Sequence, residues 1–222
     1  MNSQAILTNA DGAASMRTPT TVSKPVTTRI VPTAVLIVYA LLLALGLGLG
    51  ATYLILDGDP PFGRLRIGPW TAWPALGSAD ADPYMRAILA QRGAVPLAIG
   101  EGLGFTAVTD SEGRPLDSAC TYRIGSVAPA ARLWTFSIYD QNGQLPKTEL
   151  GRSSFTSAEI LRDTQDHFII ALSRGLQDGN WLQLPGSGNF SIVLRLYDTP
   201  GAAGTGLTES VFPAIERVEC GA

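Results

Sequence analysis

The sequence has little charge, one histidine and two cysteines, and these shortages exclude several classes of protein. A net charge of −3 gives no excess of basic residues, so a nucleic-acid-binding protein is not expected. Two cysteines in 222 residues are too few for a disulfide-dense miniprotein. With a single histidine, a zinc site would have to rely on carboxylates, and we predict neither a metal nor another cofactor.

What the sequence does contain is a long stretch without charge, from Ile30 to Leu56. At about 1.5 Å per residue it is long enough to cross a hydrocarbon core of about 30 Å as a helix. The alternative is a cleaved secretory signal, for which 50–52 (Gly-Ala-Thr) would offer the cleavage site. The long polar segment before the stretch is atypical of a signal, so we predict an uncleaved transmembrane helix over 30–56.

The flanking charges predict how this helix is oriented. Three basic residues, at positions 17, 24 and 29, precede it together with one acid, whereas Asp57 and Asp59 follow it. Arg64 and Arg66 come slightly further on. The positive-inside rule therefore favours a cytoplasmic N-terminus. We expect a disordered cytoplasmic tail over 1–29, a linker over 57–63 and a folded domain over 64–222.

Gly46 and Gly50 form a pair of small residues one helical turn apart within the apolar stretch. Such pairs let two membrane helices approach closely, so a homodimer through this face is one interpretation. Glycine is also simply frequent in membrane helices, and that is the alternative explanation.

The remaining residues show one helix and several short strands. Asp82 as N-cap, Pro83 at the first helical position and Gly93 after the end predict a helix, with an apolar stripe of Tyr84, Met85, Ile88 and Leu89. Expected strands cover 105–109, 120–124, 132–140, 167–172, 190–198 and 215–220, with a Gly-rich loop over 201–208. In 132–140 the core face is either Leu133 or the alternate set Trp134, Phe136 and Ile138. The fold class is therefore mainly β: an antiparallel β-sandwich or jelly roll with one or two short helices, preceded by a single transmembrane helix.

Three motifs in this order carry a resemblance: 133–140 (Leu-Trp-Thr-Phe-Ser-Ile-Tyr-Asp), 180–185 (Asn-Trp-Leu-Gln-Leu-Pro) and 195–198 (Arg-Leu-Tyr-Asp). Together with the closing 213–218 they resemble the DUF1214 family, from about Arg64 to the C-terminus. Gln183 departs from the family pattern, which commonly has proline there.

The resemblance implies a jelly-roll-like domain and no established reaction. It also implies a bacterial envelope protein that lacks the DUF1254 domain often found beside this family, so a separate DUF1254-type protein is the expected partner. With the predicted orientation, the helix would lie in the inner membrane and the folded domain in the periplasm.

The two cysteines both fall on the outer side of the predicted helix. An oxidising compartment permits a bond between Cys120 and Cys220, and we predict this disulfide; two separately buried thiols are the alternative.

His167 is the only residue that could serve as base in a Ser-His-Asp arrangement. No Gly-x-Ser-x-Gly motif accompanies it, so a strand-edge role is favoured. Asp163, Asp166 and His167 do not predict a metal site, because adjacent strand residues point to opposite faces. No catalytic residue is assigned.

Arg152, Asn180, Trp181 and Arg195 are the candidate ligand-binding residues. Trp181 could stack on a sugar or plug the core. Arg195 could pair with a carboxylate across the sheet, which is the default, or bind an anion. The favoured function is a non-catalytic envelope module that binds a partner or glycan. The alternative is a hydrolase of glycans or esters that uses loop carboxylates.

Overall fold

The computed structural model describes residues 32–93, 95–98, 100–127, 129–199 and 212–221. The predicted tail 1–29 and the Gly-rich loop 201–208 lie outside these residues. The chain divides into two compact units, Met1–Gly46 and Leu47–Ala222, and the folded domain is part of the second. The predicted domain boundaries stay predictions.

A long apolar helix, α1 (Thr33–Asp57), covers the predicted transmembrane stretch. It has 25 residues, none of them buried, and a mean hydropathy of 2.5 in its most apolar window. Its length and composition suffice to cross a membrane, and a signal sequence has the same two properties. The helix is therefore a candidate membrane span.

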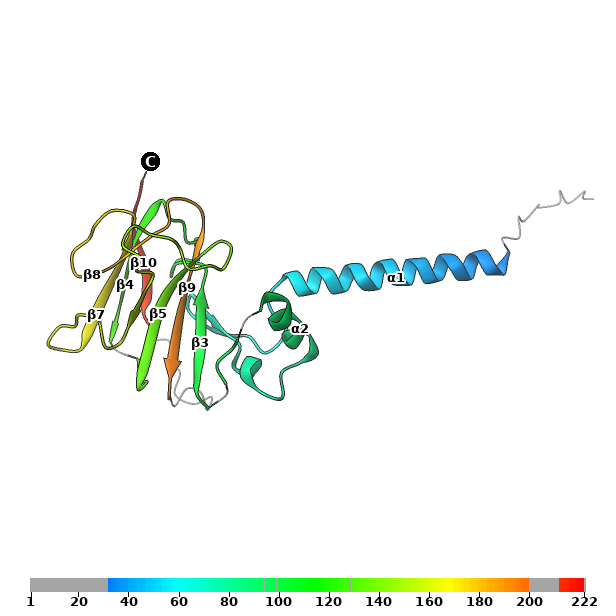
Figure 1. The fold of residues 1–222 in the computed structure, drawn as a ribbon, viewed down its shortest axis with the longest axis horizontal. Helices are drawn as coiled ribbons and strands as arrows, with labels where there is room; N and C mark the ends of the chain where they lie inside the picture. Colours follow the sequence, from blue (N-terminus) through cyan, green and yellow to red (C-terminus); the bar gives the residue numbers. More distant parts are fainter. Residues whose placement is uncertain (1–31, 94, 99, 128, 200–211, 222) are drawn as a thin grey trace, which may run out of the picture. The chain divides into compact units, whose positions relative to one another are not determined.

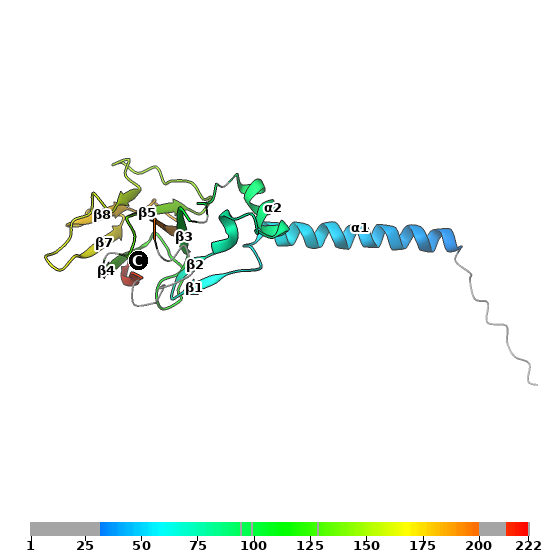
Figure 2. The same ribbon diagram turned by 90° about the horizontal axis from the view of Figure 1, so that it is seen from below.

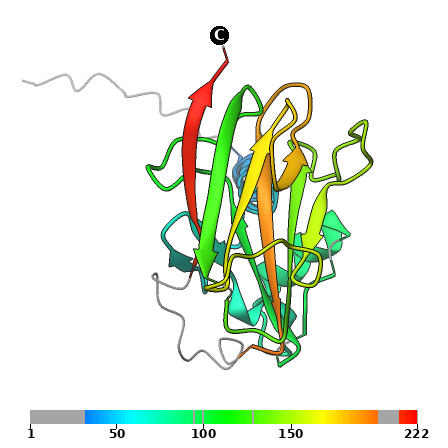
Figure 3. The same cartoon turned by 90° about the vertical axis from the view of Figure 1, so that its left-hand side faces the viewer.

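In the described residues, the folded domain consists of two sheets (Figure 1 and Figure 3). One sheet has six strands in the order β1 (Leu65–Ile67), β2 (Trp70–Ala72), β3 (Gly102–Ala107), β9 (Phe190–Tyr197), β5 (Leu133–Asp140) and β6 (Ser154–Thr156). The other has four, in the order β10 (Ala214–Cys220), β4 (Cys120–Val127), β7 (His167–Ser173) and β8 (Asn180–Gln183). Every strand predicted from the sequence is present, whereas the short strands β1, β2, β6 and β8 were not expected.

Alternation of side chains along the strands builds the core between the sheets. In β9, Ile192, Leu194 and Leu196 are buried, and the residues between them face outward and are half-buried. In β5, the buried apolar set is Trp134, Phe136 and Ile138, while Leu133 is 37% exposed. This selects the second of the two predicted faces. The side chains at the outward positions of β9 and its neighbouring strands are not part of the core, so they can line a binding site.

An antiparallel sheet was expected, but the strands β7 and β8 pair in parallel. After Ser173 the chain doubles back through 174–179 and enters β8 beside Ile170, which pairs with Asn180. Gly179 allows this return with a φ of 76°, in the left-handed region. The domain is mainly β, and its other strand pairs are antiparallel. The predicted jelly-roll connectivity of the strands is not confirmed.

The predicted helix is α2 (Pro83–Arg92), and its boundaries agree with the sequence signals. Asp82 Oδ1 accepts hydrogen bonds from the N–H groups of Tyr84 (2.9 Å) and Met85 (3.1 Å), and Gly93 ends the helix with a φ of 60°. Met85 and Ile88 are buried, but Tyr84 is 39% exposed, so the apolar stripe does not include it. A 3₁₀ helix, η1 (Pro74–Gly77), precedes α2. Within the folded domain, α2 lies on the side of β3, away from β7 and β8 (Figure 2).

The segment after α1, expected to be a linker, is fixed to α2 and to the η1 region. Arg92 Nη2 donates to the Gly58 carbonyl (2.6 Å), and Trp73 Nε1 donates to the Pro60 carbonyl (3.1 Å). Asp59 lies 3.8 Å from Arg92 Nη1 and 3.9 Å from Arg64 Nη2. The end of α1 is therefore followed by a chain segment that α2 holds in place.

The Cys120–Cys220 disulfide is present, as predicted. The two cysteines lie opposite each other on the antiparallel strands β4 and β10, with the sulfurs 2.00 Å apart. The bond joins the last strand of the chain to the middle of the four-stranded sheet.

Candidate functional site

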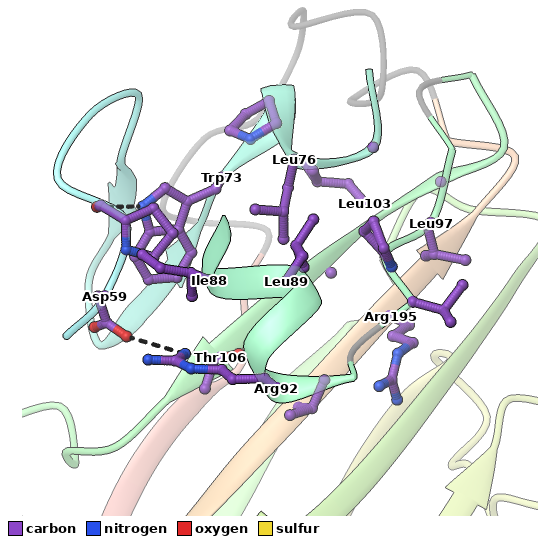
Figure 4. A pocket seen from close by; sticks show the side chains of 18 residues that line it. Asp59, Trp73, Leu76, Ile88, Leu89, Arg92, Leu97, Leu103, Thr106 and Arg195 are labelled. Atoms are coloured by element: carbon purple, nitrogen blue, oxygen red, sulfur yellow. Dashed lines mark hydrogen bonds and ion pairs between the residues drawn. The ribbon is translucent and has the colours of Figure 1, made fainter. Parts of the chain in front are cut away.

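A pocket of about 260 Å³ lies between α2, η1 and the outward face of β3 and β9 (Figure 4). We call it the α2 pocket. Its walls are mostly apolar, from Trp73, Leu76, Leu89 and Leu97. The outward side chains of the sheet, including Thr106 and Arg195, complete it.

The pocket exists because β3 places small residues beneath it. Gly102, Gly104 and Thr106 occupy its outward positions, and Gly104 pairs with Arg195 of β9. A Cβ built on Gly104 would meet its nearest atom, Arg195 Cγ, at 3.9 Å, so there is room that no side chain fills. Glycine inside a strand weakens the strand and often marks a close approach of a ligand or another backbone.

Arg195 is the half-buried cation of this pocket. Its Nη1 donates to the Tyr139 hydroxyl at 3.2 Å, and its guanidinium lies 5.9 Å from the centre of the Tyr139 ring. Among the described residues, no carboxylate lies within 4.0 Å of it. Within the described residues the expected ion pair across the sheet is not formed, and a guanidinium with further donors remains available.

At the rim of the pocket, Arg92 and Asp59 form an ion pair at 3.8 Å. Their side chains are 46% and 56% exposed, so solvent screens the pair and it contributes little stability. The rim is thus polar, and each of its two charges has an oppositely charged partner, whereas Arg195 has none among the described residues.

The other three candidate residues come together elsewhere. Arg152, Asn180 and Trp181 line a second hollow of about 570 Å³, next to strands β6 and β8, which we call the edge groove. Arg195 is not part of it. The four candidate residues predicted from the sequence therefore belong to two separate sites.

Asn180 has a positioning role in the edge groove. Its Oδ1 accepts from the Leu161 N–H (2.7 Å), and its Nδ2 donates to the carbonyls of Leu161 (2.8 Å) and Ile169 (3.0 Å). The side chain is 6% exposed and its amide is occupied, so it holds the 161 segment to the sheet.

Trp181 lies on the outward side of β8, because it pairs with the outward Ala171. Its ring is half-buried and is not part of the core cluster, so the core-plug interpretation is wrong. Nε1 donates to the Ser173 carbonyl at 3.2 Å and fixes the plane of the indole.

His167 and Asp163 form a structural pair on the surface. His167 Nδ1 lies 3.3 Å from Asp163 Oδ2, and both side chains are about half exposed. Hydrogen bonds from the backbone N–H groups of His167 and Gln165 lower the pKa of Asp163. In the described part of the chain no serine hydroxyl bonds to His167, and no group of three or more metal-ligating side chains is found. The pair closes the turn before β7.

A buried ion-pair cluster, which the sequence did not predict, lies outside both hollows. Asp110 is 1% exposed, with Arg114 Nε at 2.8 Å and Arg217 Nε at 3.2 Å from its Oδ2. Burial raises the pKa of Asp110, but hydrogen bonds from the Arg114 N–H and guanidinium, with the charge of Arg114, outweigh it and lower the pKa overall. The cluster ties the turn after β3 to β10.

The sequence missed the residues that make the α2 pocket, notably Gly104 and Trp73. A signal for Gly104 was available: in 102–107 the small residues alternate with Leu103, Phe105 and Ala107 at a period of two. Such alternation predicts a strand whose outward face is closely covered. No comparable local signal marks Trp73, which comes from a short, irregular segment.

Together, the fold and the pocket define a β-sandwich domain with a small hollow between one sheet and a covering helix. Residues 101–201 match the family DUF1214, described as a protein of unknown function. Over these residues the match confirms the resemblance. The match is shorter than the resemblance noted above: it includes Gly104, Arg195 and the edge groove, but not α2.

Among solved structures, the chain is similar to the VPA0106 protein of Vibrio parahaemolyticus, with 26% identity and a TM-score of 0.52. That similarity covers 63% of this chain and 36% of the other, so the chain spans about a third of that protein's length. An uncharacterised protein of Burkholderia cenocepacia is 15% identical with a TM-score of 0.42, covering 77% of this chain and 40% of that one. No curated protein matches the chain.

Proposed function

We propose that this protein is a membrane-anchored binding module whose α2 pocket takes a small apolar anion, such as a carboxylate on an aliphatic chain. One observation carries the proposal: Arg195 lies in an apolar hollow, half-buried, with a tyrosine hydroxyl as partner and no carboxylate within 4.0 Å among the described residues. A partly desolvated charge is costly unless it is paired, so an anionic ligand would be favoured there.

The walls and the size of the pocket indicate the rest of the ligand. Leu76, Leu89 and Leu97 offer an apolar lining, which stabilises an aliphatic body by removing it from water. Ligand pockets commonly hold about 300–1,000 Å³, so a hollow of about 260 Å³ suits a ligand of few atoms. Hydrogen bonds between a guanidinium and a carboxylate are about twice as strong as neutral ones, and they would fix the orientation of the ligand.

The alternative, a hydrolase that uses loop carboxylates, has less support. A glycosidase needs one carboxyl whose pKa is raised, so that it can donate a proton at neutral pH. The pKa values of Asp110, Glu159 and Asp163 are all lowered. These three carboxylates stay ionised and cannot act as that acid.

The location of the protein is also a proposal: α1 in a bacterial inner membrane, the N-terminus in the cytoplasm and the folded domain in the periplasm. The apolar length of α1 and the flanking charges support it. The disulfide gives further support, because such bonds persist in oxidising compartments.

We expect Gly104→Leu to abolish binding of octanoate, because the new side chain would occupy the open space between β3 and α2. Gly104→Ala adds only the Cβ, which clears its nearest neighbour by 3.9 Å, and it should retain binding. Isothermal titration of the detergent-solubilised full chain measures both. Gly104 has an ordinary strand conformation with no positive φ, so the backbone accepts either residue.

Arg195→Met keeps an unbranched apolar stem and removes the guanidinium with its charge, and it should weaken octanoate binding at least tenfold. Circular dichroism of each variant verifies that the domain is folded. Equal octanoate affinity in the wild type and Gly104→Leu would show that the ligand does not enter the α2 pocket.

The homodimer through α1 remains a prediction. Gly46 and Gly50 are one turn apart in the helix, and a Cβ at either position would meet no atom within 4 Å in the single chain. The double variant Gly46→Leu, Gly50→Leu is expected to associate less in a membrane two-hybrid assay than the parent. Association equal to that of the parent would eliminate this interface.

A further inference from the structure

We infer that the edge groove is a second binding site, independent of the α2 pocket, and that it takes a saccharide of two or three sugar rings. The pyranose ring has an apolar C–H face and polar hydroxyl edges. A matching site needs an aromatic surface next to charged or amide side chains. The edge groove combines both kinds of group.

The aromatic surface of the groove comes from Trp181 of β8, which is half-buried. Phe155 of β6 also borders the groove, but it is 3% exposed and belongs to the core, so it supports the floor rather than offering a stacking face. The hollow of about 570 Å³ is within the range of small-molecule sites and is about twice the size of the α2 pocket. A ring stacked on the indole would therefore have space for a neighbouring sugar.

The indole and the adjoining wall are held in place by hydrogen bonds. Trp181 Nε1 donates to the Ser173 carbonyl, and the Asn180 amide makes three bonds that fix the segment at Leu161. Binding then requires little ordering of the protein, which reduces the entropic cost of association.

The polar part consists of two groups of opposite charge. The Arg152 guanidinium lies 5.1 Å from the centre of the Phe155 ring, and no carboxylate of the described residues lies within 4.0 Å of it. Glu159 Oε2 accepts from the N–H (3.1 Å) and hydroxyl (3.0 Å) of Thr156. These bonds lower the pKa of Glu159, so it stays an acceptor. Sugar hydroxyls both donate and accept, and they can satisfy both groups at once.

The competing occupant is a protein surface or a second copy of the chain. Leu150, Leu161 and Leu176 also line the groove and are 63%, 67% and 81% exposed. An apolar partner covering them would also desolvate Arg152 and Glu159 without offering hydrogen bonds, which is unfavourable. The charged groups therefore favour the saccharide.

The test is titration of the solubilised full chain with cellobiose, N,N′-diacetylchitobiose and a digalacturonate, followed by calorimetry. We expect at least one of the three to bind with a Kd of about 1 mM or tighter. Trp181→Leu should weaken it at least tenfold, whereas Trp181→Phe keeps an aromatic face and should retain most of the affinity. Arg152→Gln, a change at an exposed side chain, should also weaken binding.

Octanoate affinity serves as the internal control in every variant. It should not change with Trp181→Leu or Arg152→Gln, and saccharide affinity should not change with Gly104→Leu. Absence of binding by all three saccharides overturns the inference. Saccharide affinity that is unchanged in Trp181→Leu also overturns the inference. A third contrary result is a light-scattering mass that falls from dimer to monomer in Trp181→Leu while no saccharide binds. None of these results depends on whether octanoate binds.

Discussion

Replacing Asp110 with alanine is expected to lower the free energy of unfolding by about 3–5 kcal/mol. The carboxylate is buried, and it accepts hydrogen bonds from the N–H groups of Glu112 (3.0 Å) and Arg114 (2.9 Å) through Oδ1. Its loss leaves these donors without their partner and leaves Arg217, whose side chain is 18% exposed, without its counter-charge. Chemical denaturation of the wild type and the variant measures the difference.

The chain contains a matched control for this prediction, because Asp140 makes the same turn. Its Oδ1 accepts from the N–H groups of Asn142 and Gln144, each at 2.9 Å, as Asp110 does at the equivalent positions. Asp140 is only half-buried and forms no ion pair in the described residues. Asp140→Ala should therefore cost about 1 kcal/mol. Equal losses for the two variants would mean that the ion pairs of Asp110 contribute nothing.

The sign of the pH dependence follows from the lowered pKa of Asp110 in the folded state. The folded protein holds this proton less tightly than the unfolded chain, so the stabilising contribution is present above the unfolded pKa of about 3.9. It is lost as the pH falls through the lower, folded value. Asp110→Asn should flatten that acid-side decrease in stability.

Removal of the disulfide is the second change with a large expected effect. The double variant Cys120→Ala, Cys220→Ala should unfold with a free energy about 4–5 kcal/mol lower, because the bond spans 100 residues and restricts the unfolded chain. Urea denaturation with and without reductant measures this. Reductant should destabilise the wild type and leave the double variant unchanged.

The same bond reports on the compartment in which the domain folds. Thiol labelling of protein taken from cells, denatured without reductant, should find no reactive cysteine. Two reactive thiols would contradict the proposed periplasmic location of the domain.

Regular hydrophobic patterns made most of the fold predictable. The alternation in 133–140 and 190–197 and the capping signals at Asp82 and Gly93 correspond to β5, β9 and α2. The three-residue strands β1, β2 and β6 are too short for a period of two to stand out. The parallel β7–β8 pair depends on a loop that doubles back, and local sequence does not specify the direction of pairing.

The sequence allowed single residues of the candidate sites to be predicted, but not how they group in space. Arg195, Arg152 and Trp181 stand out as polar or aromatic residues on alternating strands. Their division between two hollows depends on which strands are neighbours and on where α2 packs. The Asp110 cluster was missed because Arg217 is 107 positions away in the sequence. The two residues meet where the turn after β3 is bonded to β10, with the Ser111 N–H donating to the Ile215 carbonyl at 2.9 Å.

The most direct test of the central claim is to locate the apolar anion on the protein. Intermolecular nuclear Overhauser effects between octanoate and the methyl groups of the full chain in detergent micelles provide that location. We expect contacts from the aliphatic chain to Leu76, Leu89 and Leu97, and shifts of the Arg195 guanidinium resonances on titration. Contacts only to methyl groups outside the α2 pocket, such as those of Ile169 and Val218, would contradict it.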